Sequence, residues 1–349
     1  MAQKWFETLL KYDGLEVPRW SRKRIPGRRP GETTAAYHVR TGRNSSGRLP
    51  PRRPGESTAQ YTRRISRLRQ ERERQGQVPD ANILRDVEYV PGGHERQKLD
   101  IYLPKERSES PAPLIIWIHG GAWRAGSKDR CPARRFLDKG CAVASINYRL
   151  SQHAIFPAQL EDCKAAIRWL RANAGKYGFD SKRFGVWGSS AGGHLVALLG
   201  TTGDVKEFEK GQNLSVSSRV QAVCDYFGPT DFTLMSSFWT KMDHDSADSP
   251  ESRLVGGPVQ QNKEKCRRAN PITYVTKDDP PFLIVHGDKD PLVPRNQSEI
   301  LHKALQKAGI PAKFHTVKGG GHGGFKDPAV EKMVEDFFDE CLKFAEKAN

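Results

Sequence analysis

From about residue 82 to its end, the sequence alternates short apolar segments with amphipathic helical segments. The segment PLIIWIHG (113–120) is apolar up to its histidine and ends in glycine, which is typical of a strand buried on both faces of a sheet. The segment 156–178 instead spaces its apolar residues about one helical turn apart, at Leu160, Cys163, Ile167 and Leu170. This alternation predicts an α/β fold in which a mostly parallel central sheet has helices on both faces.

The first 78 residues have a different composition. They contain 19 Lys and Arg against 7 Asp and Glu, a net charge of +12 out of +16 for the whole chain. Large apolar residues are scarce, and the segment IPGRRPGETTAAYHVR (25–40) recurs as LPPRRPGESTAQYTRR (49–64). Such a region buries too little apolar surface to offset the entropy lost on ordering. We therefore expect residues 1–78 to form a flexible basic arm that can contact a polyanion, and residues 79–349 to form one domain.

Composition also argues against other classes of protein. No apolar run approaches the roughly 18 residues that cross a bilayer. The first residues, MAQKWFETLLKYDG, lack the apolar core of a secretory signal, so a cytoplasmic location is expected, with an extracellular one as the alternative if the true N-terminus differs. The six cysteines form no C-x-x-C pair, which argues against structural zinc and against a disulfide scaffold. The sequence carries no signature of an oligomeric state.

The most specific chemical motif is GSSAG (188–192), which matches the pattern G-x-S-x-G. It follows the apolar segment RFGVW and precedes the helical pattern AGGHLVALL, so it occupies a turn from strand to helix. The glycines two residues before and after Ser190 allow a sharp turn, which exposes the serine hydroxyl beside a helix N-terminus. Ser190 is therefore the predicted nucleophile, in preference to its neighbour Ser189.

A second glycine-rich motif, HGGAW (119–123), follows directly after the apolar strand. Glycines at this place allow backbone N–H groups to approach a developing oxyanion. This loop and the N–H group of Ala191, the residue after the nucleophile, are expected to form an oxyanion hole together. We expect His119 to brace the loop rather than to act as a base.

A serine nucleophile needs a base, and the base needs a carboxylate that orients it. The segment FLIVHGDKDPLVP (282–294) ends a late strand and offers Asp288 and Asp290, between which composition does not choose. Asp288 comes directly after the strand, where a carboxylate most easily caps local backbone N–H groups. The last predicted strand is followed by a glycine-rich loop that contains His322, the candidate base. The order serine, aspartate, histidine is typical of a triad built around G-x-S-x-G in this kind of fold.

Five motifs in this order, HGGAW, GSSAGGHL, DYFGPTDF, HGDKDPLVP and GGGHGGF, resemble those of the α/β-hydrolase esterases. The resemblance spans roughly residues 82–349 and is greatest to the acetyl esterase and feruloyl-esterase-like group, which is related to the hormone-sensitive-lipase esterases. It implies an α/β-hydrolase fold that uses neither a cofactor nor a metal. The implied catalytic residues are Ser190 as nucleophile, Asp290 as acid and His322 as base, with an oxyanion hole at Gly121, Ala122 and Ala191.

The chain departs from the hormone-sensitive-lipase pattern at one position. Relatives in that group usually carry a third glycine where this chain has Ala122. A backbone donor survives this change, but the wall of the acyl pocket is altered.

Residues 229–279 separate two predicted strands and are too many for an ordinary connection. We expect them to form a cap-like insertion over the active-site edge of the sheet, with an aromatic part that forms one wall of the substrate pocket. Trp239 from this insertion and Trp123 from HGGAW are the predicted substrate-binding residues. The alternative is a surface helix that packs the aromatic side chains of the insertion into the core.

These observations predict a serine carboxylesterase for short acyl or aryl esters. By the resemblance alone, the substrate is an acetyl or feruloyl ester on a plant polysaccharide, or a small-molecule ester of this kind. An amidase, a formamidase or an oligopeptidase-like hydrolase could use the same triad. A protein of another class, which binds polyanions through its basic arm, is the remaining alternative.

Overall fold

The computed structural model describes residues 60–61, 64, 82–106 and 110–344. The predicted basic arm (1–78) and its repeat therefore lie outside the described residues, apart from Gln60, Tyr61 and Arg64. The arm, its boundary with the domain and its contact with a polyanion stay predictions. Within the described part of the chain, no helix is long and apolar enough to cross a membrane.

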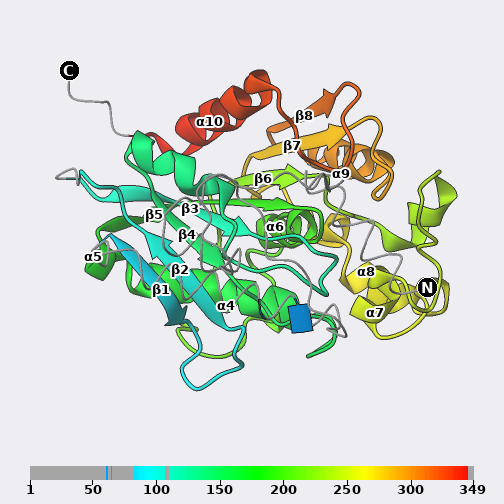
Figure 1. The fold of residues 1–349 in the computed structure, drawn as a ribbon, viewed down its shortest axis with the longest axis horizontal. Helices are drawn as coiled ribbons and strands as arrows, with labels where there is room; N and C mark the ends of the chain where they lie inside the picture. The colour runs from blue at the N-terminus through cyan, green and yellow to red at the C-terminus, as the bar shows by residue number, and fades with distance from the viewer. Residues whose placement is uncertain (1–59, 62–63, 65–81, 107–109, 345–349) are drawn as a thin grey trace, which may run out of the picture. The chain divides into compact units, whose positions relative to one another are not determined.

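An eight-stranded sheet forms the centre of the described structure, in the order β1-β2-β4-β3-β5-β6-β7-β8 (Figure 1). The first two strands form an antiparallel hairpin, β2 pairs antiparallel with β4, and every later pair is parallel. The prediction of a mostly parallel central sheet is confirmed. The strands are β1 (Ile83–Glu88), β2 (Lys98–Tyr102), β3 (Ala112–Ile118), β4 (Ala142–Ile146), β5 (Phe179–Ser189), β6 (Ala222–Tyr226), β7 (Phe282–Gly287) and β8 (Ala312–Val317).

The apolar run of β3 is continuous because each of its faces enters a separate hydrophobic core. Leu114, Ile116 and Ile118 belong to the first core. Ile115 and Trp117, which point to the opposite face, belong to the second. A strand with water on one face would have alternated apolar and polar residues instead.

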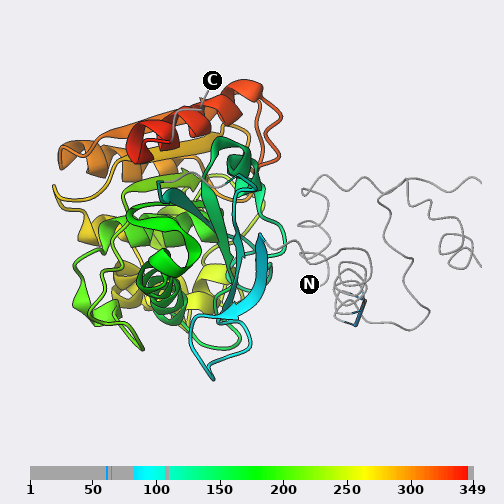
Figure 2. The ribbon, with the colours of Figure 1, turned by 90° about the vertical axis from the view of Figure 1, so that its left-hand side faces the viewer.

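Helices lie against both faces of the sheet (Figures 1 and 2), and their side chains supply the other half of each core. The first core receives apolar side chains from α4 (Ala158–Ala172), α6 (Ala191–Thr201) and α9 (Asn296–Lys307). The second core receives them from the 3₁₀ helix η1 (Pro132–Lys139) and from α10 (Pro328–Leu342). The apolar face predicted for 156–178 is confirmed, because Leu160, Cys163, Ile167 and Leu170 are all fully buried.

The predicted insertion at 229–279 is a series of short helices joined by turns rather than one surface helix. Side chains of Asp231, Ser249 and Asn270 cap three of these helices by accepting backbone N–H groups. The insertion contains η3 (Phe232–Ser237), α7 (Pro250–Val255), η4 (Val259–Gln261), α8 (Lys263–Arg268) and η5 (Pro271–Tyr274). The remaining short helices, α5 (Ala174–Tyr177) and η2 (Lys206–Phe208), lie in other connections.

The sequence motifs all follow the carboxyl ends of parallel strands. HGGAW follows β3, GSSAG ends β5, the two candidate aspartates follow β7, and the loop of His322 follows β8. The carboxyl ends of parallel strands lie at one edge of a sheet, which is where α/β proteins place their sites. The topology therefore collects segments up to about 200 residues apart in the chain at one edge.

Candidate active site

Ser190 occupies the turn between β5 and α6. Its backbone has φ 55° and ψ −121°, a conformation that L-residues rarely adopt and that marks a tightly held turn. The Ser190 N–H group donates to the carbonyl of Tyr226 (2.8 Å), and its carbonyl accepts the N–H group of His194 (3.0 Å). Both backbone groups of the serine are thus anchored, and its side chain projects from the sharp bend at the start of α6.

The loop at 119–126, hereafter the oxyanion loop, packs backbone to backbone against this turn. A Cβ atom on Gly120 would lie 2.7 Å from the Ser189 carbonyl oxygen and 3.3 Å from Ser190 Cβ. Only glycine permits this approach, so the loop stands directly beside the predicted nucleophile.

The three predicted oxyanion donors are left available by the fold. The loop curls through positive φ at Gly121 (108°) and Ala122 (56°), and the Gly121 carbonyl accepts the N–H groups of Arg124 and Ala125 at 3.0 Å. The N–H groups of Gly121, Ala122 and Ala191 donate to no other residue in the described part of the chain. Ala191 begins α6, whose first N–H groups have no partner inside the helix. Three N–H groups at this turn are therefore free to bind an anion.

Asp290 and His322 meet at the ends of β7 and β8. The Nδ1 atom of His322 donates to Oδ2 of Asp290 over 2.7 Å. The other oxygen of Asp290 accepts the N–H groups of Leu292 (2.8 Å) and Val293 (3.0 Å). The carboxylate is held by its own turn, and it presents one oxygen to the imidazole.

A second histidine faces the same carboxylate. His286, fully buried in β7, has Nε2 3.2 Å from Oδ2 of Asp290 and 2.9 Å from the Val293 carbonyl. Burial alone would raise the pKa of the Asp290 carboxyl, but the charge of His322 and hydrogen bonds from His286 and His322 outweigh it. The net effect is a pKa well below the ordinary value, so Asp290 is ionised at neutral pH.

Asp288 has a different role from the one expected. Its Oδ1 atom accepts the N–H group of Gly319 (2.6 Å), which ties the turn after β7 to the loop after β8. The expectation of local capping at Asp288 is wrong, because Asp290 caps its own turn and Asp288 reaches across to the neighbouring loop. Between the two aspartates, the structure brings Asp290 alone to His322.

Phe227 packs against the candidate base from the end of β6. Its ring centroid lies 4.6 Å from that of His322, and it also contacts Phe325. Phe227 adopts φ 42°, which turns the chain at the end of the strand. Among the described residues, no hydrogen bond joins Ser190 to His322; such contacts are often long before substrate binds.

Trp123 and Trp239 lie in opposite environments. Trp123 is 1% exposed and packs edge-on against His194 and Phe232 beneath the oxyanion loop. The geometry does not support its predicted contact with substrate, because neighbouring side chains cover its ring. Trp239 is 75% exposed.

A groove of about 600 Å³ runs beside the turn of Asp290, and Trp239 and Phe238 form one of its walls. The other wall comes from the turn after β7 and the start of α9, including Lys289, Pro291 and Arg295. The aromatic part of the insertion is thus divided: Phe232 and Met235 are buried in the core, whereas Phe238 and Trp239 face the groove. The core packing expected in the alternative therefore holds for Phe232 and Met235, and a substrate-pocket wall at Phe238 and Trp239 stays a prediction.

Sequence reasoning missed three residues that support the site: Arg96, Phe227 and His286. Two of them lie inside quoted motifs, DYFGPTDF and HGDKDPLVP, but nothing in a motif indicates which side chain packs on which. Arg96 lies in the hairpin between β1 and β2, far from every motif. Within the described residues, no group of three or more His, Cys, Asp and Glu side chains could hold a metal ion.

This arrangement is typical of an α/β hydrolase. The serine lies on a strand-to-helix turn, a loop with free N–H groups lies beside it, and a paired Asp–His lies at the same sheet edge. The model of the BD-FAE family matches residues 99–305, more than half of the chain, and that of the dienelactone hydrolase family matches residues 266–347. The chain belongs to the BD-FAE family. The resemblance to α/β-hydrolase esterases is confirmed.

The relatives and solved structures agree with this assignment. Esterase LipC of Mycobacterium tuberculosis is 33% identical over 255 residues, which cover 70% of this chain and 62% of LipC. A truncated carbohydrate esterase from gut microbiota is 40% identical with a TM-score of 0.70, over 75% of this chain and 97% of that one. A bifunctional GH43-CE of Bacteroides eggerthii is 41% identical with a TM-score of 0.69, over 74% of this chain and 38% of that one. This chain thus spans less than two thirds of LipC and of the bifunctional protein.

Proposed function

We propose that this protein is a serine carboxylesterase that works through a Ser190–His322–Asp290 triad and an acyl-enzyme. The observation that carries the proposal is the 2.7 Å bond from His322 to Asp290, at the sheet edge where Ser190 stands on its strained turn. Named esterases among the relatives support the same class of reaction.

The chemistry follows from the atoms that the triad leaves available. Because Nδ1 of His322 donates to Asp290, Nε2 is the atom that can accept the hydroxyl proton of Ser190. The serine oxygen then attacks the ester carbonyl, and the N–H groups of Gly121, Ala122 and Ala191 bind the resulting oxyanion. His322 gives the proton to the leaving alcohol. Water then takes the place of the alcohol: it loses a proton to His322 and attacks the acyl-enzyme, and His322 returns the proton to Ser190 as the acid leaves. Ionised Asp290 stabilises the imidazolium in both halves.

The proposed substrates are short acyl or aryl esters of carbohydrates, such as acetyl or feruloyl esters on a polysaccharide. The groove is lined by Asp290 but not by Ser190, His322 or residues 119–126. It supports the proposal because it places the exposed side chains of Phe238 and Trp239 beside polar residues such as Asn296 and Glu299. A sugar ring, with an apolar face and a polar rim, suits such walls. Two solved relatives are described as carbohydrate esterase or as a bifunctional GH43-CE.

A substrate panel tests both parts of the proposal. The purified protein is assayed on p-nitrophenyl esters of increasing acyl length, on acetylated and feruloylated xylo-oligosaccharides, and on matched aryl amides, with Ser190→Ala as the control. Hydrolysis of the short esters that is lost in the variant supports the esterase. Preferential hydrolysis of the amides would favour the amidase alternative, and equal activity of the variant would refute the triad.

A further inference from the structure

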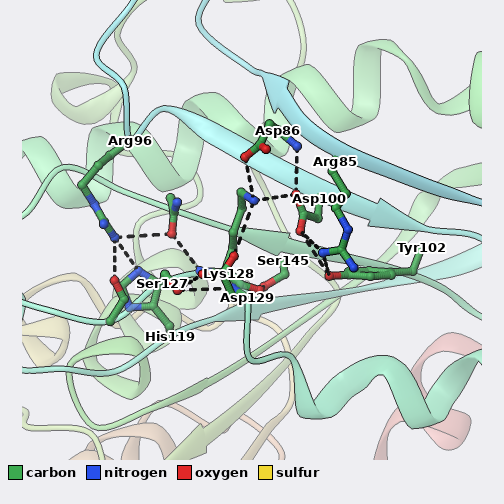
Figure 3. Close-up of polar contacts among 12 residues, drawn as sticks. Arg85, Asp86, Arg96, Asp100, Tyr102, His119, Ser127, Lys128, Asp129 and Ser145 are labelled. Atoms are coloured by element: carbon green, nitrogen blue, oxygen red, sulfur yellow. Dashed lines mark hydrogen bonds and ion pairs between the residues drawn. The ribbon is translucent and has the colours of Figure 1, made fainter. Parts of the chain in front are cut away.

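Arg96 joins the β1–β2 hairpin to both ends of the oxyanion loop (Figure 3). One nitrogen of its guanidinium, Nη2, donates to Nε2 of His119 and to the carbonyl of Gly126, each over 3.0 Å. Its Nε atom donates to the carbonyl of Tyr148 over 2.8 Å. A side chain that sequence analysis did not single out thus contacts the first residue of the loop and the last.

Two contacts of the His119 ring, one with Arg96 and one with the Gly120 carbonyl, agree on which nitrogen carries the proton. A guanidinium only donates hydrogen bonds, so Nε2 of His119 must accept and must be unprotonated. The proton of the neutral ring is then on Nδ1, which lies 2.6 Å from the Gly120 carbonyl and donates to it. Burial, and next the charge of Arg96, lower the pKa of His119 to about 3, so the ring is neutral at ordinary pH.

The hydrogen bond to Gly120 in turn sets the direction of a predicted oxyanion donor. The carbonyl of Gly120 and the N–H group of Gly121 belong to one planar trans peptide, in which the two groups point in opposite directions. When His119 holds the carbonyl on one side, the N–H group of Gly121 must point to the other side. His119 itself is held by stacking on Tyr148, with ring centroids 4.4 Å apart, and is 4% exposed.

We propose that Arg96 is a positioning residue for the oxyanion hole: by fixing the Nδ1–H tautomer of His119, it fixes the Gly120–Gly121 peptide and thereby aims the N–H group of Gly121. The proposal rests on the esterase function proposed above, since it concerns the same oxyanion. Arg96 touches neither the substrate nor a reacting atom.

The chain after the loop has its own anchor, so a variant at Arg96 should still fold. Lys128, 4% exposed, places Nζ 2.6 Å from Asp100 and 2.9 Å from Asp86, and its N–H group donates to the side chain of Asn147 (Figure 3). The contacts with Asp100 and Asp86 do not involve Arg96, whereas the side-chain oxygen of Asn147 also lies 3.4 Å from Nη2 of Arg96. A substitution of Arg96 should therefore change the direction of the Gly121 N–H group rather than unfold the domain.

The matched control is Arg171, another half-buried arginine that donates to backbone carbonyls, those of Ser181, Ser217 and Arg219. Its contacts lie away from the oxyanion loop. Arg171→Lys should lower the melting temperature and leave kcat and KM unchanged. A purely structural role for Arg96 would give the same result in Arg96→Lys and Arg96→Met.

The kinetic experiment measures kcat, KM and the affinity for a trifluoromethyl ketone, which Ser190 converts into a hemiketal oxyanion. In Arg96→Met we expect kcat to fall by about 10²-fold, in the range seen when one oxyanion donor is lost, with KM within about threefold. Affinity for the ketone should fall in parallel with kcat/KM. Arg96→Lys should recover part of the rate, because an ammonium can still donate to one of the partners. A folded Arg96→Met that keeps kcat within about twofold of the unsubstituted protein overturns the proposal.

A second readout is independent of activity. In protein labelled with ¹⁵N-histidine, the His119 ring should show an Nδ1-bound proton, and in Arg96→Met the Nε2–H form should gain population. An Nε2–H form in the unsubstituted protein, or no change of tautomer in the variant, overturns the proposal. If the unsubstituted protein hydrolyses no ester, the proposed function fails, while the tautomer experiment still decides whether Arg96 controls His119.

Discussion

Ser190, Asp290 and His322 lie at the ends of strands of the central sheet, whereas Phe238 and Trp239 lie in the insertion, directly after η3. Around the first set, backbone N–H groups and buried side chains hold the groups in place, such as the bonds from Leu292 and Val293 to Asp290 and the ring of Phe227 against His322. Around the second set, the side chains are exposed by 49% and 75%.

The two regions meet two different requirements of an esterase, the chemical step and the selection of the ester. Chemistry requires donors and acceptors held within a few tenths of an ångström, which a packed sheet edge provides. Selection among esters requires a wall that can differ without disturbing the chemistry, which an insertion of short helices provides. Substitutions in the two regions should therefore change different kinetic parameters, and by different amounts.

The largest expected effect is at the nucleophile. Ser190→Ala should lower ester turnover by about 10⁴- to 10⁶-fold, because no other group at the turn can form the acyl-enzyme. Ser189→Ala, one residue away within β5, should change turnover by less than about threefold and is the matched control. Turnover is measured with p-nitrophenyl acetate, and a fluorophosphonate probe identifies the labelled serine. Labelling at Ser189 would contradict the assignment.

The next effect concerns the two aspartates. Asp290→Asn should lower kcat by on the order of 10⁴-fold with little change in KM, because an amide cannot stabilise the imidazolium. Asp288→Asn keeps an oxygen for the Gly319 N–H group, so its kcat should stay within a few-fold and its unfolding free energy within about 1 kcal/mol. Both rates and both denaturation midpoints are measured. An inactive Asp288→Asn beside an active Asp290→Asn would reverse the roles.

In the insertion, the expected effect is smaller and depends on the substrate. Trp239→Ala should raise KM for an acetylated xylo-oligosaccharide by about tenfold, or about 1.4 kcal/mol, and leave kcat/KM for p-nitrophenyl acetate within about twofold. Leu214→Ala removes an exposed apolar side chain that does not line the groove and should change neither value. Equal losses on both substrates would mean that the insertion also supports the chemistry.

A buried carboxyl group in the central sheet also predicts that stability depends on pH. Asp225 is fully buried at the end of β6, and burial raises the pKa of its carboxyl from 3.8 to about 7, partly opposed by a hydrogen bond from the Gly228 N–H group. The folded state therefore holds this proton more tightly than the unfolded state. This group favours folding at low pH, and its contribution is lost as pH rises from about 4 to about 7.

Asp225→Asn isolates that contribution, because the amide oxygen still accepts from Gly228 but does not ionise. The difference in unfolding free energy, variant minus unsubstituted protein, should grow in favour of the variant between pH 4 and pH 8. Denaturant unfolding at several pH values measures it. A difference that stays constant over this range would show that Asp225 does not titrate there.

The smallest expected effect is at the N-terminal arm, which carries neither the sheet-edge residues nor the groove. Deletion of residues 1–78 should leave turnover of p-nitrophenyl acetate within about threefold and remove most of the affinity for a polyanion such as heparin. In the full chain that affinity should fall steeply with added salt. A loss of folding on deletion would place the arm among the structural elements of the domain.

Much of the fold and the site could be predicted because local patterns carry them. The apolar run of 113–118 is continuous because both faces of β3 are buried, so it predicts a central strand. The turn at Ser190 is recognisable because Gly188 and Gly192, two residues away on each side, leave no room for a Cβ atom. Local patterns narrow the acid to the turn that holds Asp288 and Asp290, and the family resemblance selects Asp290, because both side chains are chemically able to face a histidine. The direction of each side chain depends on which backbone N–H groups lie nearby.

The class of sheet, the order of the motifs and the residue types at the sheet edge can be read from local patterns, because secondary-structure periodicity and turn chemistry are properties of neighbouring residues. Tertiary structure alone decided that Trp123 is buried while Trp239 is exposed, that Phe227 packs on His322, and that Arg96 reaches His119 from another hairpin. These contacts join residues that are distant in the chain, and their geometry follows from how the sheet and its loops pack. No local pattern encodes that packing.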